Sequence, residues 1–167
     1  MTRQTQGTAA NGTYHHQLHN NTRMTNGIII VDHGSRREES NRMLEEIATL
    51  FARRFEHKYP IVEPAHMELA EPSIATAYAR CVKRGAQRVI ICPFFLGPGK
   101  HWTEDIPRLA AQAARQHPHT TYHVTMTLGI DELMLDLLDK RVSFCIEHRF
   151  DCDACRGTIR QGGVAPQ

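Results

Sequence analysis

Short apolar runs and segments with helical spacing alternate along the chain. The apolar runs lie at residues 28–32, 61–69 and 88–94, and residues 120–128 form a fourth segment that is rich in β-forming residues. The first run is apolar without alternation, which is typical of a parallel strand buried on both faces. Because a helical pattern follows each run, the sequence predicts one α/β domain built on a small sheet of four parallel strands.

Residues that favour helix ends mark the bounds of four predicted helices. Ser, Thr and Asp side chains accept hydrogen bonds from the free N–H groups of a first turn, whereas Pro and Gly favour opposite ends of a helix. Such signals occur at Ser35 with Glu38 (a capping-box pattern), Pro60, Pro72, Gly85, Thr103 and Asp131.

Apolar residues repeat at a spacing of three or four in these segments, so one face of each helix is expected to be buried. Right-handed crossovers place the helices on both faces of the sheet. Four strands are few for such a sheet, and pairing with a second copy of the chain is therefore expected. The expected buried positions of the first, second and last helices are Met43, Leu44, Ile47, Leu50, Phe51 and Phe55; Ile74, Ala77, Tyr78, Cys81 and Val82; and Leu133 or Met134, Leu137, Leu138 and Val142.

The two ends of the chain differ from its middle. Residues 1–25 contain no acidic residue and show no apolar period, which predicts a disordered tail or the remnant of an organellar transit peptide. Residues 26–143 hold the predicted strands and helices, and residues 144–167 form a tail that contains three cysteines. We therefore expect one domain with an appendage at each end.

Charge and hydropathy argue against several classes of partner. The formal net charge is only +2, so the broad basic field of a nucleic-acid-binding protein is not expected. No apolar stretch approaches the roughly 20 residues that a membrane-spanning helix needs. The chain also contains neither a GxGxxG nor a GK[ST] loop, so nucleotide binding is only weakly supported.

Two histidines follow predicted strands and precede predicted helices. His33 comes after the first strand and His101 after the third, while Glu68 ends the second. Loops at the carboxyl ends of parallel strands gather at one edge of a sheet, where ligands bind. Two imidazoles there could hold a divalent metal ion or move protons near neutral pH, with Glu68 as a third ligand or proton acceptor. The alternative is that all three are ordinary polar residues.

Four motifs, in this order, resemble those of the small-type sirohydrochlorin chelatases. They are Asp-His-Gly-Ser-Arg at residues 32–36, Met-Glu-Leu-Ala-Glu-Pro-Ser-Ile at 67–74, Pro-Phe-Phe-Leu at 93–96 and Gly-Lys-His-Trp at 99–102. The resemblance extends from residue 27 to residue 143. These class II tetrapyrrole chelatases insert cobalt or ferrous iron into sirohydrochlorin, so the resemblance implies a flavodoxin-like chelatase fold and a homodimer.

The resemblance also implies roles for individual residues. His33 and His101 would be catalytic residues that bind the metal ion and accept protons, and Glu68 would take a second proton. Sirohydrochlorin is rich in carboxylates, which the backbone after Ser35 and the cations Arg36 and Lys100 could bind. ATP would not be needed, because the metal chelate is the stable product.

Three of the five cysteines lie in the C-terminal tail, as Cys145, Cys152 and Cys155. Their spacing could suit zinc or redox chemistry. It also resembles the tail of plant plastid sirohydrochlorin ferrochelatases, which carries a 2Fe–2S centre. Such a centre normally takes four protein ligands, so a fourth must come from Cys92, His148, a partner chain or an external ligand.

The leading interpretation is a sirohydrochlorin ferrochelatase that uses Fe(II), located in the plastid or otherwise in the cytoplasm. A cobaltochelatase of cobalamin synthesis that uses Co(II) is the alternative within enzymes, because histidine suits both metals. A carrier of metal or tetrapyrrole without catalytic activity is the alternative from another class. Turnover without ATP would separate an enzyme from a carrier.

Overall fold

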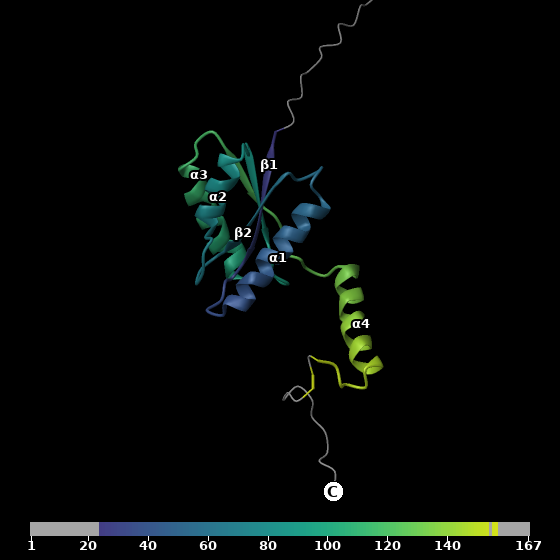
Figure 1. Cartoon of the computed structure of the whole chain (residues 1–167). Helices are drawn as coiled ribbons and strands as arrows, with labels where there is room; N and C mark the ends of the chain where they lie inside the picture. The colour runs from purple at the N-terminus through teal and green to yellow at the C-terminus, as the bar shows by residue number, and fades with distance from the viewer. Residues whose placement is uncertain (1–23, 154, 157–167) are drawn as a thin grey trace, which may run out of the picture.

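The computed structural model describes residues 24–153, 155 and 156. Its strands are β1 (Asn26–Asp32), β2 (Ile61–His66), β3 (Arg88–Pro93) and β4 (Thr121–Val124). They form one parallel sheet in the order β2-β1-β3-β4 (Figure 1). The predicted four-stranded parallel sheet is therefore confirmed.

Helices cover both faces of this sheet, as predicted. α1 (Glu38–Arg54) lies on one face, and α2 (Ile74–Lys83) packs beside α3 (Ile106–Arg115) on the other (Figure 1). A π-helical turn, η1 (His101–Asp105), leads directly into α3. α4 (Glu132–Glu147) lies apart from this body, at the lower right of Figure 1.

The larger part of the core lies between the sheet and the pair formed by α2 and α3. Alternate side chains of the strands are buried against these two helices. Tyr78 and Cys81 of α2, both expected on its buried face, are fully buried. The strand and α3 members of this core include Ile29, Val31, Ile61, Ala65, Val89, Ile91, Ile106 and Ala110.

The core under α1 is smaller. Leu44 and Ala48 of α1 are buried there with Ile28, Ile30 and Val62 of the strands. α1 packs mainly over β1 and β2. The other half of this face, over β3 and β4, has much less cover.

The strand register brings the carboxyl ends of three strands to one edge. Asp32, the last residue of β1, pairs with His66, the last residue of β2. Val31 pairs with Pro93, the last residue of β3. The loops that contain the predicted catalytic residues therefore leave the sheet from neighbouring points.

Two predicted helix starts are wrong. α1 begins at Glu38, and Ser35 Oγ accepts a hydrogen bond from the N–H of Arg37 at 3.0 Å instead of capping the helix. Thr103 lies inside the π-helical turn, where its Oγ1 donates to the carbonyl oxygen of Gly99 at 3.2 Å. In both cases the start depends on the path of the preceding loop, which a local capping pattern does not encode.

The start of α4 is confirmed, but the predicted burial of its apolar face is wrong. The Asp131 carboxylate caps the helix by accepting the N–H of Leu133 at 2.9 Å. α4 has no buried residue, because it projects away from the sheet. It also continues to Glu147, so the first residues of the predicted tail are helical. The residues of α1 and α4 that were expected to be buried but are exposed are Met43, Leu50, Phe55, Leu133, Leu137, Leu138 and Val142.

The predicted N-terminal appendage, residues 1–25, lies outside the described residues except for its last two. Of these, Thr25 accepts hydrogen bonds from the backbone N–H groups of Gln87 and Arg88 at the start of β3. Within the described residues, the helices are too short or too polar to cross a membrane.

Candidate active site

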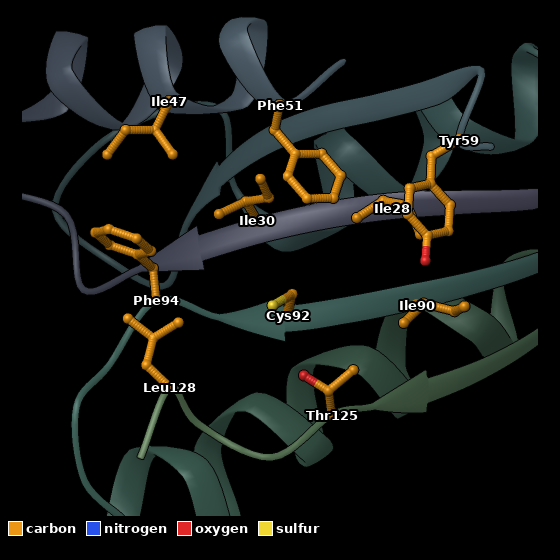
Figure 2. A pocket seen from close by; sticks show the side chains of 10 residues that line it. All are labelled: Ile28, Ile30, Ile47, Phe51, Tyr59, Ile90, Cys92, Phe94, Thr125 and Leu128. Carbon is orange, nitrogen blue, oxygen red and sulfur yellow. The ribbon is translucent and has the colours of Figure 1, made fainter. Parts of the chain in front are cut away.

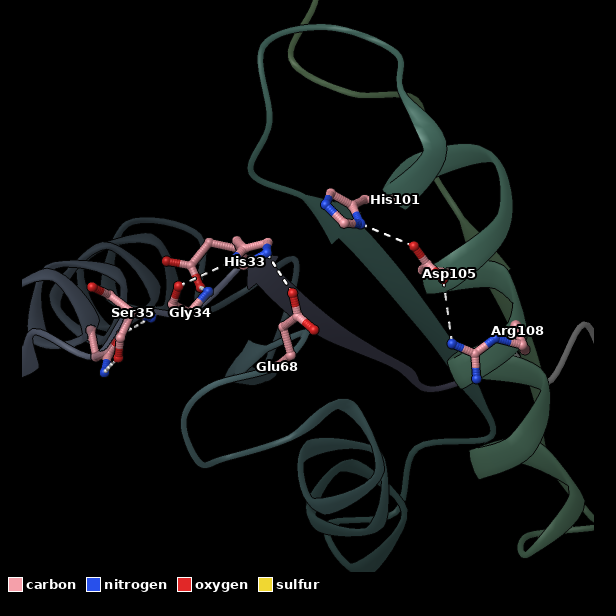
Figure 3. A network of polar contacts seen from close by, with 9 residues as sticks. His33, Gly34, Ser35, Glu68, His101, Asp105 and Arg108 are labelled. Atoms are coloured by element: carbon pink, nitrogen blue, oxygen red, sulfur yellow. Dashed lines mark hydrogen bonds and ion pairs between the residues drawn. The ribbon is translucent and has the colours of Figure 1, made fainter.

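His33 and Glu68 lie face to face across the ends of β1 and β2. Nε2 of His33 lies 2.6 Å from Oε1 of Glu68 (Figure 3). The other ring nitrogen, Nδ1, lies 3.1 Å from the carbonyl oxygen of Gly34, which can only accept a hydrogen bond. Nδ1 therefore carries a proton, and the short contact between Nε2 and Oε1 needs a second proton between the two atoms. The pair is thus suited to take up and release a proton.

Backbone contacts hold the loops of this pair together. The N–H of Met67 donates to the carbonyl oxygen of Asp32 at 2.8 Å, and the N–H of Glu68 donates to that of His33 at 3.1 Å. Gly34 has a φ of 83°, and a Cβ at this position would collide with the carbonyl oxygen of Glu68. Glycine is therefore required for this close approach of the two loops.

His101 approaches the same point from the loop after β3. Its ring centroid lies 5.2 Å from that of His33, and the rings meet edge to face (Figure 3). Nδ1 of His101 lies 3.0 Å from Oδ2 of Asp105, and Oδ1 of the same carboxylate lies 3.4 Å from Nη2 of Arg108. The hydrogen bond with His101 is the main cause that lowers the pKa of the Asp105 carboxyl. A carboxylate that accepts the Nδ1–H of an imidazole leaves Nε2 with a lone pair for a metal ion.

The π-helical turn places His101. This residue and Asp105 form the two ends of η1, and their side chains meet on one side of the turn. Trp102 anchors the turn to the end of β4, because its Nε1 donates to the carbonyl oxygen of Thr125 at 2.9 Å. π-helical turns are rare and occur frequently at functional sites.

The three predicted catalytic side chains are brought together and remain open to a ligand. Their exposed fractions are 40% for His33, 53% for Glu68 and 45% for His101. One imidazole presents a lone pair, and the other shares a proton with a carboxylate. This arrangement suits the exchange of protons for a metal ion on a bound molecule.

The predicted substrate-binding residues belong to the same loops. The N–H of Ser35 donates to Oδ1 of Asn41 at 2.9 Å, and Nδ2 of Asn41 donates back to the carbonyl oxygen of Ser35 at 2.9 Å. This double contact fastens the loop after His33 to α1. Arg36 and Lys100 are exposed, and neither forms an ion pair within the part of the chain that the structure describes. Their charges are available to an anionic ligand.

The tail cysteines form a second group, at the end of α4. The sulfur atoms of Cys145, Cys152 and Cys155 all lie within 4.8 Å of one another. A hydrogen bond with Cys152, assisted by burial, raises the pKa of the Cys155 thiol to about 11. A bound cation would reverse this shift, because it stabilises the thiolate. Neither Cys92 nor His148 belongs to this group among the described residues.

The residues that orient the site were not predicted from the sequence. Asp105 and Asn41 were not among the predicted residues, and neither was the pair formed by Asp32 and His66. The spacing of four residues between His101 and Asp105 is a signal that could have identified the carboxylate, since such residues meet in a helical turn. No comparable signal exists for His66, whose partner lies on another strand.

Two histidines and a carboxylate lie at the carboxyl edge of the sheet in this α/β domain. Such a site is typical of enzymes that handle metal ions, and not of nucleotide-binding proteins. A model of the CbiX family matches residues 27–144. The chain therefore belongs to the CbiX family, and the resemblance to small chelatases is confirmed.

Two curated relatives illustrate the range of this family. The chain is 52% identical over 136 residues to the chloroplastic sirohydrochlorin ferrochelatase of Arabidopsis thaliana, which covers 79% of this chain and 60% of that protein. It is 39% identical over 90 residues to the sirohydrochlorin cobaltochelatase of Methanocaldococcus jannaschii, which covers 54% of this chain and 62% of that protein. The chain thus spans less than two thirds of the length of these relatives.

Solved structures share the fold. The sirohydrochlorin chelatase SirB from Bacillus subtilis subspecies spizizenii, in complex with cobalt, matches with a TM-score of 0.62 and 30% identity over 72% of this chain and 51% of that chain. SirB from Bacillus subtilis with Fe³⁺ matches with a TM-score of 0.57 and 29% identity over 77% of this chain and 47% of that chain. The flavodoxin-like chelatase fold is therefore confirmed.

Proposed function

We propose that this protein is a sirohydrochlorin ferrochelatase, which inserts ferrous iron into sirohydrochlorin to give siroheme without ATP. The observation that carries the proposal is the meeting of His33, His101 and Glu68 at one edge of a chelatase fold. Insertion exchanges two pyrrole protons for one divalent metal ion. The site therefore needs at least one ligand for the metal ion and acceptors for the protons.

In this proposal the two histidines have different tasks. His101 is oriented by Asp105 and offers Nε2 to the incoming Fe(II). His33 and Glu68 share one proton in the resting arrangement. They pass it to solvent, accept one proton from the macrocycle, release that proton to solvent and then accept the second. Because Nε2 of His33 is the atom that Glu68 faces, His33 binds the metal ion only after its contact with Glu68 is released.

The exposed cations on the same loops would bind the substrate. In the sequence, Arg36 follows His33 in the loop after β1, and Lys100 directly precedes His101. Charge-assisted hydrogen bonds from these side chains, with N–H groups after Ser35, would hold carboxylates of sirohydrochlorin. One copy supplies only a four-stranded sheet and one pair of histidines, so we include a homodimer in the proposal.

The tail would hold a 2Fe–2S cluster. Three thiols within 4.8 Å of one another fit three of the four ligands that such a cluster takes. Cys145, Cys152 and Cys155 would supply them, and the fourth ligand would come from Cys92, His148, a partner chain or an external group. The likeness to a chloroplastic relative supports a plastid location.

The alternative activity is insertion of Co(II), which the likeness to a cobaltochelatase supports. A steady-state assay with sirohydrochlorin and Fe(II) or Co(II) under anaerobic conditions, followed by absorbance, separates the readings. We expect turnover without ATP and a higher kcat/KM with Fe(II). A higher value with Co(II) would favour the cobaltochelatase. Stoichiometric binding without turnover would contradict both and leave a carrier.

A further inference from the structure

Leu69 lies in a strained turn directly after Glu68. Its φ is 67°, in the left-handed region that bulky side chains rarely adopt. The N–H of Ala70 donates to the carbonyl oxygen of Glu68 at 2.9 Å, so these residues form a γ-turn with Leu69 at its centre. A γ-turn with a positive φ is rare and strained, and strain of this kind is concentrated at active sites and ligand-binding segments.

The fold needs the backbone of this turn more than it needs the leucine side chain. The carbonyl oxygen of Glu68 is the atom with which a Cβ on Gly34 would collide, so the turn is part of the close approach of the two loops. A glycine in place of Leu69 would adopt the same φ without strain. The leucine side chain is 54% exposed and belongs to neither core cluster. The fold therefore gains no core packing from the side chain that causes the strain.

The loop that carries Leu69 is held at both ends. Before Leu69, two backbone N–H groups donate to carbonyl oxygens at the end of β1, as described above. After it, the carbonyl oxygen of Pro72 accepts the N–H of His66 at 2.7 Å. The Glu71 carboxylate accepts the N–H of Ser73 at 2.8 Å, at the start of α2. The side chain of Leu69 thus sits on a loop that is already ordered, so little ordering is needed when a ligand binds.

Phe94 and Leu96, in the loop after β3, are also exposed, but each lines a hollow elsewhere. Phe94 lies at one end of the apolar hollow beside α1 (Figure 2). Leu96 lines a hollow against the start of α4. Leu69 lines neither hollow, and it follows the residue whose carboxylate meets His33 (Figure 3). Its apolar surface is therefore assigned best to a ligand of the histidine site.

We propose that Leu69 is a substrate-contact residue, whose side chain packs against the face of bound sirohydrochlorin beside Glu68. This inference rests on the proposed function, because it names a contact of that substrate. The conjugated ring of a tetrapyrrole is flat and apolar on both faces, whereas its carboxylates extend from the rim. Leu69 contacts the face, while the cations described above bind the rim. The contact selects a ligand with a flat apolar face at a site whose other proposed contacts are polar.

Three variants at position 69 separate the side chain from the backbone. Leu69→Gly adopts the same φ without strain but removes the side chain, and Leu69→Asn keeps its size and tolerates a positive φ but is polar. Leu69→Met keeps an apolar side chain. Each full-length variant is titrated with metal-free sirohydrochlorin. Binding is followed by the fluorescence of Trp102, which is the only tryptophan of the chain and lies next to His101 in the sequence.

We expect Leu69→Gly and Leu69→Asn to raise the dissociation constant and the KM for sirohydrochlorin about 5–10-fold, because the ring loses an apolar partner. The kcat and the KM for Fe(II) should stay within about twofold of wild type, since the contact is the same in the ground state and the transition state. Leu69→Met should resemble wild type. The denaturation midpoint of Leu69→Gly should not fall, because the strain is relieved. Phe150→Gly, at another exposed apolar residue with a positive φ, is the matched control and should leave the KM unchanged.

The possible outcomes separate this contact from the proposed function. Normal turnover with an unchanged KM and dissociation constant in Leu69→Gly and Leu69→Asn would overturn the contact and leave the enzyme. A lower kcat with an unchanged KM would reduce Leu69 to a support for Glu68. A weaker dimer in sedimentation with an unchanged KM would assign the side chain to a second copy, and both results would overturn the contact. Fluorescence quenching that depends on Leu69, without turnover of Fe(II) or Co(II) by the wild type, would keep the contact and refute the enzyme. A wild type that does not bind sirohydrochlorin would refute both.

Discussion

Nδ1 of His66 lies 2.6 Å from Oδ1 of Asp32, so the last residues of two neighbouring strands are joined by their side chains. The same Asp32 oxygen accepts the backbone N–H of Gly34 at 2.9 Å. His66 is fully buried, and its Nε2 has no hydrogen-bond partner among the described residues. Through Asp32, this contact ties the loop that carries His33 to the end of β2.

Replacing His66 tests this positioning role. His66→Leu should lower kcat/KM for metal insertion about 10–100-fold, the usual range for residues that orient a metal-binding group. His66→Asn should restore part of the activity, because its amide can still donate a hydrogen bond to Asp32. His57→Leu, at a histidine whose side chain is 97% exposed, is the control. Unchanged kcat/KM in a folded His66→Leu protein would contradict the role.

Loss of either catalytic histidine should affect chemistry far more than folding. We expect His33→Ala and His101→Ala each to lower kcat/KM at least about 100-fold, the lower limit of a typical contribution from a general base. His33 lies in a loop and His101 at the start of the short turn η1, both outside the core, so circular dichroism and the denaturation midpoint should stay near wild type. Near-normal turnover at limiting metal in either variant would show that the assigned role is wrong.

Glu68→Gln tests the shared proton. The amide keeps the size of the side chain but cannot take up a proton in exchange with Nε2 of His33. The variant should lower kcat more than it raises KM for the metal, because proton acceptance and not metal binding is removed. Steady-state kinetics with Fe(II) as the varied substrate give the two constants. A rise in KM with unchanged kcat would instead make Glu68 a metal ligand.

The fold and the place of the site could be predicted because their signals are local. β1 is a continuous apolar run, and the positions of His33 and His101 in the loops after the first and third strands place both at one edge of a parallel sheet. The contact between His33 and Glu68 could not be predicted, since it depends on the strand register and on the close approach at Gly34. The orientation of His101 depends on a π-helical turn, which has no established sequence pattern.

The predicted burial of the apolar face of α4 is wrong for a different reason. A helical period predicts that an apolar face is buried, but not which surface buries it. Leu137 and Val142 are apolar at the expected spacing and are exposed within their own chain. The pattern remains consistent with burial if the covering surface belongs to a second copy.

Cys81 provides a prediction about stability that is independent of the site. Burial raises the pKa of its thiol to about 12, from an ordinary value of 9.0. A folded state that holds a proton more tightly than the unfolded state is stabilised below the unfolded pKa and loses this stability as pH rises toward the folded pKa. The loss should therefore occur between about pH 9 and 12. Cys81→Ala should flatten the fall of the denaturation midpoint in this range and lower the free energy of unfolding at neutral pH by about 1 kcal/mol. An identical pH dependence in both proteins would contradict it.

A 2Fe–2S cluster on the tail cysteines should colour the protein, and the rest of the chain should fold without this cluster. Anaerobically purified protein should be brown and hold about two irons per chain if each chain carries a 2Fe–2S cluster. Cys145→Ser, Cys152→Ser and Cys155→Ser should each lose the colour, because the three sulfur atoms lie within 4.8 Å of one another.

A chain that ends at Glu147 keeps α4 whole, so it should remain folded and colourless and retain much of its chelatase activity. Iron analysis and visible absorbance give the result. Colourless wild-type protein after anaerobic reconstitution, or stoichiometric zinc without iron, would contradict the cluster and leave the histidine site untouched.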